Sequence, residues 1–370
     1  MNIRPIQSKT DLRTFLDLPY RLYRSDPVWV PPLRSEQRGQ FDPRRNPLLD
    51  HCDWQHFLII ENGEAIGRVT AFTDRLALEA WNEPIGMFGY YECVNNQAAS
   101  QMLLGAARDW LRGRGMRLMR GPWSFVSQEW GMVIEGFEPS PVVMAPYNPP
   151  YYNEQLAAFG LAKVKDLLCW YISGREGYHI PERILKLTHL VAQRYGVRVR
   201  QIDMRRYEEE VELVIDLSNR SLIDNWGYSP VTEAEVKAMA RDMKPIIHPK
   251  GVLFAEDREG RPIGFAIALP DVNSLLKGLN GRLFPLGWLK ILWGLPRLHS
   301  YRMFALGVIP EYHGKGVDSL IYRALHESIY TPEIWMEINY VLEDNVPMTN
   351  AIRKLNARPL RRYRIYEMGI

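Results

Sequence analysis

A turn that carries two glycines is the part of the sequence best suited to bind an anion. It follows an apolar stretch ending at Ile309 and precedes a stretch with helical spacing. Glycines let the backbone approach a ligand closely, and the free amides at a helix start point toward phosphate oxygens. The candidate ligand-binding residues are those around this turn: Leu306, Val308, His313, Gly314, Lys315, Gly316, Val317 and Asp318.

Two common phosphate-binding motifs are excluded at this turn. The Gly-Lys-Ser/Thr ending of the P-loop is absent. The three glycines and downstream acid of the dinucleotide fingerprint are not in register. Asp318 leaves two interpretations open. Its carboxylate would repel a pyrophosphate that it faced, but at a helix start it would also cap amides and suit the helix dipole.

The elements that must position this turn occur in an order that the chain uses twice. We expect strand, helix, hairpin, strand, helix, strand, helix and strand in each half. This order predicts an α/β protein with two tandem domains, each a mixed, mostly antiparallel sheet flanked by helices. The predicted division is a domain at residues 1–174, a connecting helix at 175–196, and a domain at 197–370 with an apolar insertion at 271–299.

The turn and its neighbours resemble the GNAT superfamily, the Gcn5-related N-acetyltransferases. The signature of that family is a strand ending in Val-x-Pro, followed by Gln/Arg-x-x-Gly-x-Gly/Ala at the start of a helix. Val308, Pro310 and Gly316 match this signature. His313 stands where Gln or Arg is usual, and Asp318 stands where Gly or Ala is usual. The resemblance implies that the turn amides hold the pyrophosphate of acetyl-CoA.

A second block near the C-terminus supports the resemblance. The family follows its next strand with an Asn and then with a helix that reads roughly Leu-Tyr-Glu-Lys-Leu-Gly-Phe. Asn345, Lys354 and Leu355 match, and the match adds Asn345 to the cofactor-binding residues. Ile352 replaces the Tyr that often acts as general acid toward the leaving thiolate. The resemblance covers Val197 to the C-terminus in element order.

The first half resembles the same fold more faintly. Its strand at Phe88–Asn95 leads into a helix, but the connecting Val94-Asn95-Asn96-Gln97 has no glycine turn. We therefore expect the first half to be a degenerate copy that does not bind CoA.

Acyl transfer to an amine requires a polarised thioester carbonyl and an amine that has lost a proton. In the family, two parallel strands separate and expose backbone groups to the thioester and the pantetheine arm. This separation maps onto the strand that ends at Val308 and the strand predicted at Ile334–Tyr340. The resemblance thus implies that the amide of Val308 polarises the carbonyl. Because this amide is a backbone group, it would remain as a donor even where the side chains differ from those of the family.

The base and the acid for this chemistry have several candidates. Glu337 is one, because an apolar strand raises the pKa of a carboxylate toward a useful range. The alternative is that Glu337 is a charge on a solvated strand face. Tyr312 and His313 are further candidates for the base. Tyr340 and Tyr366 are candidates to protonate the thiolate, with core or edge packing as their alternative role.

The insertion at Ser274–Leu298 combines many large apolar residues with four basic ones, Lys277, Arg282, Lys290 and Arg297. Three interpretations stay open. The insertion could form a lid or wall of an apolar acyl or amine pocket, or lie as a helix on an anionic membrane surface. It could also pack between the two halves.

Composition and charge narrow the function further. The chain has 46 basic and 43 acidic residues, which is too even for nucleic acid as the main partner. The three cysteines, Cys52, Cys93 and Cys169, predict a reduced, cytoplasmic setting. We expect no secretory signal and no transmembrane segment, because no run of about 18 uncharged apolar residues occurs. His51, Cys52 and His56 match no zinc spacing, so no metal is expected.

The leading hypothesis is a tandem GNAT-like enzyme. Its C-terminal half would bind an acyl-CoA, acetyl-CoA by default, and transfer the acyl group to an amine of a small molecule or peptide. Its N-terminal half would shape the acceptor site. One rival is a non-catalytic fold that binds a ligand or partner, favoured by Ile352 and Asp318. Another is a transferase that uses a long-chain acyl-CoA or an acyl carrier protein. The oligomeric state is left open.

Overall fold

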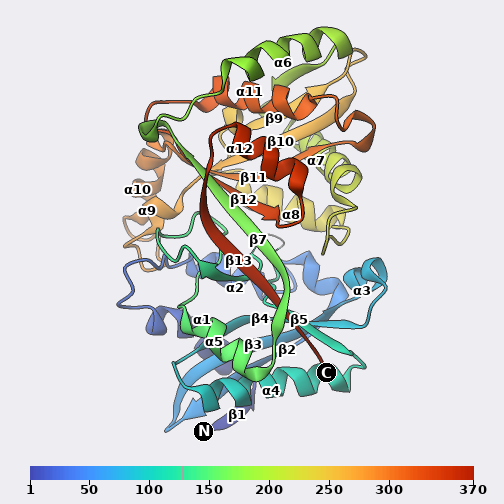
Figure 1. Cartoon of the computed structure of the whole chain (residues 1–370). Helices are drawn as coiled ribbons and strands as arrows, with labels where there is room; N and C mark the ends of the chain where they lie inside the picture. The colour runs from blue at the N-terminus through green and yellow to red at the C-terminus, as the bar shows by residue number, and fades with distance from the viewer. Residues whose placement is uncertain (127–128) are drawn as a thin grey trace. The chain divides into compact units, whose positions relative to one another are not determined.

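The computed structural model describes residues 1–126 and 129–370 and divides into two compact units (Figure 1). Unit 1 comprises Met1–Leu167, Leu276–Trp288 and Arg361–Ile370, and unit 2 comprises Leu168–Leu275 and Leu289–Leu360. Each unit is an α/β structure with a mostly antiparallel sheet flanked by helices, as predicted. The units do not follow chain order, because the last ten residues belong to unit 1.

The sheet of unit 1 has the order β1-β2-β3-β4-β5-β13-β7, with β6 paired to β13. Among its described strands, β4 and β5 pair in parallel, whereas β1–β2, β2–β3, β3–β4, β5–β13 and β6–β13 are antiparallel. The elements that begin in this unit are β1 (Asn2–Pro5), α1 (Lys9–Leu22), α2 (Arg34–Gln40), β2 (Cys52–Glu61), β3 (Glu64–Asp74), α3 (Arg75–Trp81), β4 (Ile85–Cys93), α4 (Gln97–Gly113), β5 (Leu118–Gly121), β6 (Met132–Glu135), α5 (Tyr151–Phe159) and β7 (Ala162–Ser173).

The sheet of unit 2 has the order β7-β12-β11-β10-β9-β8. Its β11 and β12 pair in parallel, whereas β8 to β11 are antiparallel to their neighbours. The remaining elements are α6 (Glu182–Tyr195), β8 (Arg198–Gln201), α7 (Tyr207–Leu222), α8 (Glu233–Met243), β9 (Val252–Glu256), β10 (Pro262–Pro270), α9 (Asn273–Leu276), α10 (Gly287–Gly294), β11 (Ser300–Val308), α11 (Val317–Ile329), β12 (Trp335–Leu342), α12 (Val346–Lys354) and β13 (Arg358–Gly369).

Local sequence explains several of these elements. Asn62 and Gly63 both have positive φ and join β2 to β3 as a two-residue hairpin turn, as predicted. Thr232 and Glu235 form the expected capping box at the start of α8. Ser8 caps α1 through the amide of Asp11.

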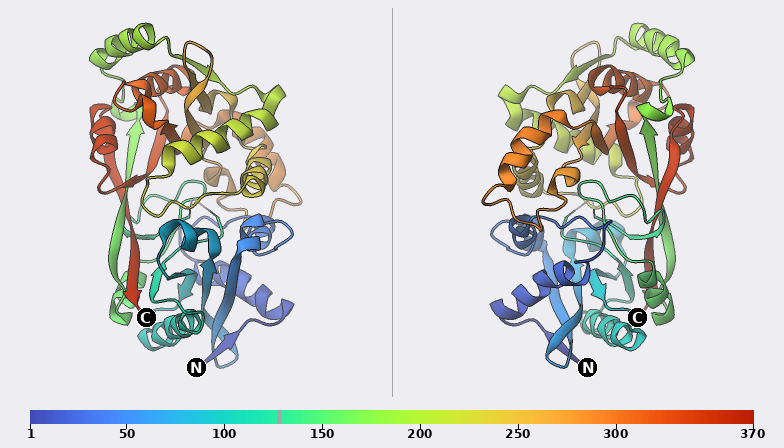
Figure 2. Two further views of the ribbon diagram at one scale, coloured as in Figure 1. Left: turned by 90° about the vertical axis from the view of Figure 1, so that its right-hand side faces the viewer. Right: turned by 90° about the vertical axis from the view of Figure 1, so that its left-hand side faces the viewer.

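Helices cover both faces of each sheet. In unit 1, β2 and β3 lie between α1 and α4 (Figure 2). In unit 2, a Cβ at Gly307 would meet Ser221 of α7, whereas one at Gly264 would contact Ile321 of α11. Side chains alternate along a strand, and Gly264 is paired with Val308, the residue after Gly307. Helices α7 and α11 therefore pack on opposite faces of β10 and β11.

Candidate functional site

The strands β11 and β12 pair over only part of their lengths. Their parallel register runs from Ser300 opposite Trp335 to Met303 opposite Ile338. Both strands continue, to Val308 and Leu342. Beyond Met303, β11 still pairs with β10. Among the described residues, the pairing of β11 with β12 does not continue past Met303. A separation of two parallel strands is thus present where the family resemblance requires it.

Backbone geometry places the amides of Leu306 and Val308 on the edge of β11 that faces this separation. Ile309 donates its N–H to Ile263 of the β10 strand at 2.9 Å, which makes Ile309 and Ile263 a hydrogen-bonded pair. Antiparallel pairs alternate between bonded and non-bonded. The N–H and C=O groups of Val308, and by the same alternation those of Leu306, therefore point away from β10. The predicted carbonyl donor at Val308 has the required direction.

His313 is bound to the backbone of the same strand. Its Nε2 lies 2.7 Å from the carbonyl oxygen of Val308 and donates to it, because that oxygen can only accept. This contact fastens the turn to the end of β11. It also occupies one ring nitrogen of a residue that we considered as a base.

The turn after β11 ends in two glycines with left-handed backbone conformation. Gly314 has φ 71° and Gly316 has φ 79°, values that favour glycine. A Cβ at Gly316 would lie 3.1 Å from Val191 of α6, whereas one at Gly314 would meet nothing within 4 Å. Gly316 is the N-cap residue of α11 and has no side chain with which to cap it. The amides of Val317 and Asp318 therefore lack an intrahelical acceptor, whereas that of Ser319 donates to the carbonyl oxygen of Gly316 at 3.1 Å.

Charges of both signs flank this helix start. The Nζ of Lys315 lies 4.4 Å from the ring centre of Tyr312 and 5.6 Å from that of Tyr195. Asp318 is half-buried in the first turn of α11. Burial, and then the charge of Asp318, raise the pKa of Tyr322 one turn further along.

A buried polar cluster lies beside the start of the separation. Arg302 and Glu337 are opposite each other in the parallel register and are 0% exposed. Asn339 joins them: its Nδ2 donates to Glu337 Oε1 at 3.0 Å, and its Oδ1 accepts from Arg302 Nε at 3.1 Å. The guanidinium of Arg302 lies 5.4 Å from the ring centre of Tyr340. The interpretation of Glu337 as a solvated surface charge is therefore wrong.

The cluster faces α7 rather than the α11 core. The neighbouring residues Tyr301, Met303 and Met336 belong to the core that also contains Leu325 of α11. Alternation along the strands puts Arg302, Glu337 and Asn339 on the other face. Sequence analysis missed Arg302 as part of the site. The available signal was a single Arg within the apolar strand Tyr-Arg-Met-Phe-Ala-Leu.

The second sequence block has structural roles at two positions. Asn345 is the N-cap of α12, and its Oδ1 accepts from the amide of Met348 at 3.1 Å. Ile352, which stands where a Tyr is often found, is buried in the core of unit 2. The contact of Asn345 with a cofactor stays a prediction.

The corresponding junction in unit 1 is closed by the chain itself. β4 and β5 pair in parallel at Ile85–Met87, and β4 then continues to Cys93. Trp123 follows β5 and donates its amide to the carbonyl of Phe88 at 2.9 Å. A Cβ at Gly89 would overlap the carbonyl oxygen of Trp123, so the two backbones are in close contact.

The starts of the two helices differ as well: a side chain caps α4, whereas none caps α11. Asn96 is the N-cap of α4, and its Oδ1 accepts from the amide of Ala99 at 3.1 Å. A side chain of the protein thus satisfies an amide at the position where α11 has Gly316.

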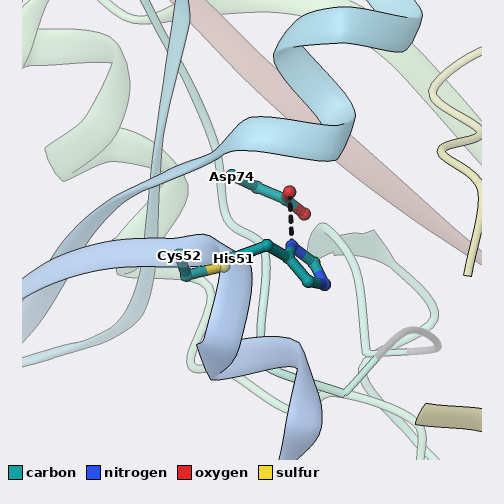
Figure 3. A group of neighbouring side chains, drawn as sticks. All are labelled: His51, Cys52 and Asp74. Carbon is teal, nitrogen blue, oxygen red and sulfur yellow. Dashed lines mark hydrogen bonds and ion pairs between the residues drawn. The ribbon is translucent and has the colours of Figure 1, made fainter. Parts of the chain in front are cut away.

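Three side chains in unit 1 have ligand atoms close enough to consider a metal ion: His51, Cys52 and Asp74 (Figure 3). The Nδ1 of His51 lies 2.8 Å from Asp74 Oδ1. That oxygen also accepts from the amides of Leu76 and Ala77 at the start of α3. Helix capping explains the position of the carboxylate, and we assign no metal to this group.

Comparison with known proteins identifies the family. No family model matches the sequence. The chain is 32% identical over 376 residues to protein YghO of Escherichia coli, covering 100% of this chain and 95% of YghO. It is also 32% identical over 386 residues to the bacterial ceramide synthase of Caulobacter vibrioides, covering 100% of this chain and 98% of that enzyme. The chain belongs to the family of these two proteins.

Solved structures confirm that this chain, a relative of the ceramide synthase, has a tandem GNAT fold. A tandem GNAT protein from the clavulanic acid biosynthesis pathway superposes with a TM-score of 0.59 at 14% identity, covering 100% of this chain and 98% of that one. A GCN5-related glucosamine N-acetyltransferase region of a fungal β-N-acetylglucosaminidase gives a TM-score of 0.60 at 12% identity, covering 99% of this chain and 38% of that one. At these identities the likeness concerns the fold alone.

Within the described residues of this tandem GNAT protein, no helix is both long enough and apolar enough to cross a bilayer.

Proposed function

We propose that this protein is an N-acyltransferase that moves an acyl group from an acyl-CoA to the amine of a long-chain, sphingoid-type acceptor. The observation that carries the proposal is the junction of β11 with α11. There the amides of Leu306 and Val308 face the strand separation, and Gly316 leaves the helix start uncapped. The full-length similarity to a bacterial ceramide synthase supports a lipid amine as acceptor.

The turn would hold the pyrophosphate of the cofactor. The amides at the start of α11 are oriented as anion donors, and the Lys315 ammonium adds a positive charge nearby. Gly314 and Gly316 allow the phosphates to approach the backbone. The pantetheine arm would then run along the open edge of β11 toward Val308.

The acyl group would be transferred directly. The amine nitrogen attacks the thioester carbonyl carbon, and the amide of Val308 stabilises the negative charge that develops on the carbonyl oxygen. The C–S bond then breaks, which yields an amide and CoA. The ammonium form of the acceptor gives up one proton before attack, and the attacking nitrogen gives up a second. We assign the first proton to solvent water and the second to Glu337, and Tyr340 donates a proton to the CoA thiolate. The proton on Glu337 then replaces, through solvent, the one that Tyr340 gave up, so that the net release is one proton per acyl group transferred.

Arg302 and Asn339 would act as positioning residues for Glu337. Asn339 donates to one carboxylate oxygen, which restrains its orientation. Arg302 in turn holds Asn339 by its Oδ1 atom and contributes a buried positive charge. Such a network holds a buried carboxylate in place, which a general base requires.

The setting that we propose is the cytoplasm, where acyl-CoA is present. Cys52, Cys93 and Cys169 are buried free thiols, which suits a reducing compartment.

The experiment that tests this function supplies purified protein with acetyl-, octanoyl- or palmitoyl-CoA and with sphinganine as acceptor. Mass spectrometry detects the N-acyl product, and a thiol reagent detects released CoA. We expect equal amounts of both products, and no product with ethanolamine, which lacks the chain. An acyl-carrier-protein donor and a lysine peptide are run beside them. Absence of N-acyl sphinganine with every donor would contradict the proposal, as would faster acylation of the peptide.

A further inference from the structure

The insertion exposes a group of large apolar side chains to solvent. Five residues of the continuous stretch from 284 to 293 form this apolar patch. They are Phe284 (79% exposed), Leu286 (69%), Trp288 (43%), Leu292 (60%) and Trp293 (64%). Single exposed apolar residues are ordinary, but five within ten residues of chain indicate an interaction surface. That the insertion packs between the two halves stays an open alternative.

The backbone beneath the patch is fixed at both ends. The amide of Arg34 donates to the carbonyl of Gly281 at 3.0 Å, before the patch. After it, Gly294 of α10 packs so closely on Leu275 that a Cβ would lie 2.5 Å from that side chain. Within the patch, the indole Nε1 of Trp288 donates to the carbonyl of Pro285 at 2.9 Å. The apolar side chains are thus held outward on a structured segment.

The charged side chains of the insertion itself have one sign. Lys277, Arg282, Lys290 and Arg297 are exposed, and no Asp or Glu occurs between residues 272 and 299. This short stretch carries a charge of +4, whereas the whole chain carries +3. The surroundings of the patch therefore attract an anionic partner.

Aromatic residues, leucines and a basic border match the interface of an anionic bilayer. Trp side chains favour the boundary between headgroups and acyl chains, and Lys and Arg bind anionic headgroups. Helix α10 has 8 residues, about 12 Å of helix, which is far too short to span. A short amphipathic segment of this kind lies in the plane of the interface.

We propose that the stretch from Phe284 to Trp293 docks this protein on the surface of an anionic phospholipid bilayer. The apolar patch would enter the interface, and the four basic side chains would contact lipid phosphates. This inference goes beyond the proposed reaction and does not depend on it. It would also explain how an enzyme without a described membrane-spanning helix reaches lipid substrates.

The test is co-sedimentation of the full chain with vesicles, without acyl donor or acceptor. One set contains phosphatidylglycerol and phosphatidylethanolamine, and the other contains phosphatidylcholine alone. We expect at least ten-fold stronger partitioning onto the anionic vesicles, lost in high salt. The triple variant Phe284→Ser, Leu292→Ser and Trp293→Ser should lower partitioning at least ten-fold. Lys290→Ala should lower it about five-fold.

The matched control is the double variant Leu190→Ser and Ile223→Ser, which removes exposed apolar side chains from α6 and from the C-cap of α7. We expect it to partition within two-fold of the unchanged protein. Equal partitioning of the triple variant and the unchanged protein would overturn the proposal, and so would failure of the unchanged protein to bind anionic vesicles. A dimer in light scattering that the triple variant breaks, without vesicle binding, would assign the patch to a second copy instead. Because no reaction is measured, these results stand apart from those of the acyltransferase assay.

Discussion

The junctions β4–α4 and β11–α11 occupy the same place in two copies of one fold, yet they present different surfaces. In unit 1, Trp123 lies against Phe88 and Gly89 where the strands part, and Asn96 caps the helix. In unit 2, the β11–β12 register ends at Met303, and Gly316 begins the helix without a capping side chain. One junction is filled by the protein, and the other offers backbone donors to a ligand.

We take the difference between the two junctions as the basis of the proposed cofactor site in unit 2. The strand–helix–strand arrangement alone does not create a site, since both units have it. In our proposal, a ligand binds only where the protein places neither a capping side chain at the start of the helix nor a loop between the two strands. A capped helix gains about 1 kcal/mol of stability, which a ligand site forgoes. We therefore propose cofactor binding for unit 2 and a structural role for unit 1.

The largest effect that we predict is on the open junction. Gly316→Glu should abolish CoA binding, because it places a second carboxylate beside the anion site and a side chain 3.1 Å from Val191. The readout is thermal melting with excess CoA, where a ligand at about 100 times its Kd adds about 2.7 kcal/mol.

The control for this prediction separates charge from backbone strain, since Gly316 has φ 79°. Lys315→Glu reverses a charge without touching either glycine, and it should also weaken CoA binding. A folded Gly316→Glu protein that keeps its affinity would remove this turn from the account.

The second prediction separates binding from chemistry in unit 2. Glu337→Gln should lower kcat by about 10²–10⁴-fold, because the base is lost while the hydrogen bond from Asn339 Nδ2 remains available to the amide oxygen. CoA affinity, measured by the same melting assay, should stay within two-fold. Unchanged kcat would exclude Glu337 as the base.

The third prediction concerns the interior of unit 1. Burial, and then the charge of Arg68, lower the pKa of His56 to about 3. The folded pKa is below the ordinary value of 6.5, so the neutral His56 supports stability above pH 6.5. This support is lost as the pH falls from 6.5 toward 3, because the unfolded chain takes up a proton that the folded unit does not.

At pH 4.5 this loss amounts to about 3 kcal/mol. His56→Gln should remove that part of the acid sensitivity while it keeps a polar partner for Thr70. Hydrogen exchange of peptides from β2 and β3, at pH 7 and pH 4.5, measures the change in stability of unit 1 alone. The same pH dependence in both proteins would contradict burial as the cause.

The smallest predicted effect is on the closed junction. Asn96→Ala removes the cap of α4 and should cost about 1 kcal/mol of stability. It should leave CoA affinity unchanged, in contrast to Gly316→Glu. Denaturant unfolding measures the first quantity, and calorimetry with CoA measures the second. A fall in CoA affinity would show that the unit 1 junction takes part in binding.

The features that depend on neighbouring residues could be predicted from the sequence. The glycine spacing and the Val-x-Pro ending predict the turn before α11, because these depend on backbone conformation at each residue. The repeated order of elements likewise predicted both sheets. The burial of Glu337 was not evident, because its partner Arg302 is 35 positions away and meets it only through the register of two parallel strands.

The features that could not be predicted depend on contacts between distant parts of the chain. Residues Arg361–Ile370 end the chain but belong to unit 1, which element order along the sequence cannot indicate. The insertion is rich in Leu and Trp, a composition that usually indicates burial, yet Phe284 and Trp293 are mostly exposed. Asn345 matches a family position, but its visible role is to cap α12.

The central claim is that only the junction in unit 2 binds the cofactor. Isothermal titration of the unchanged protein with CoA tests it most directly, because the stoichiometry counts the sites. The account predicts one CoA per chain. Two equivalents per chain, or no binding at millimolar CoA, would contradict it.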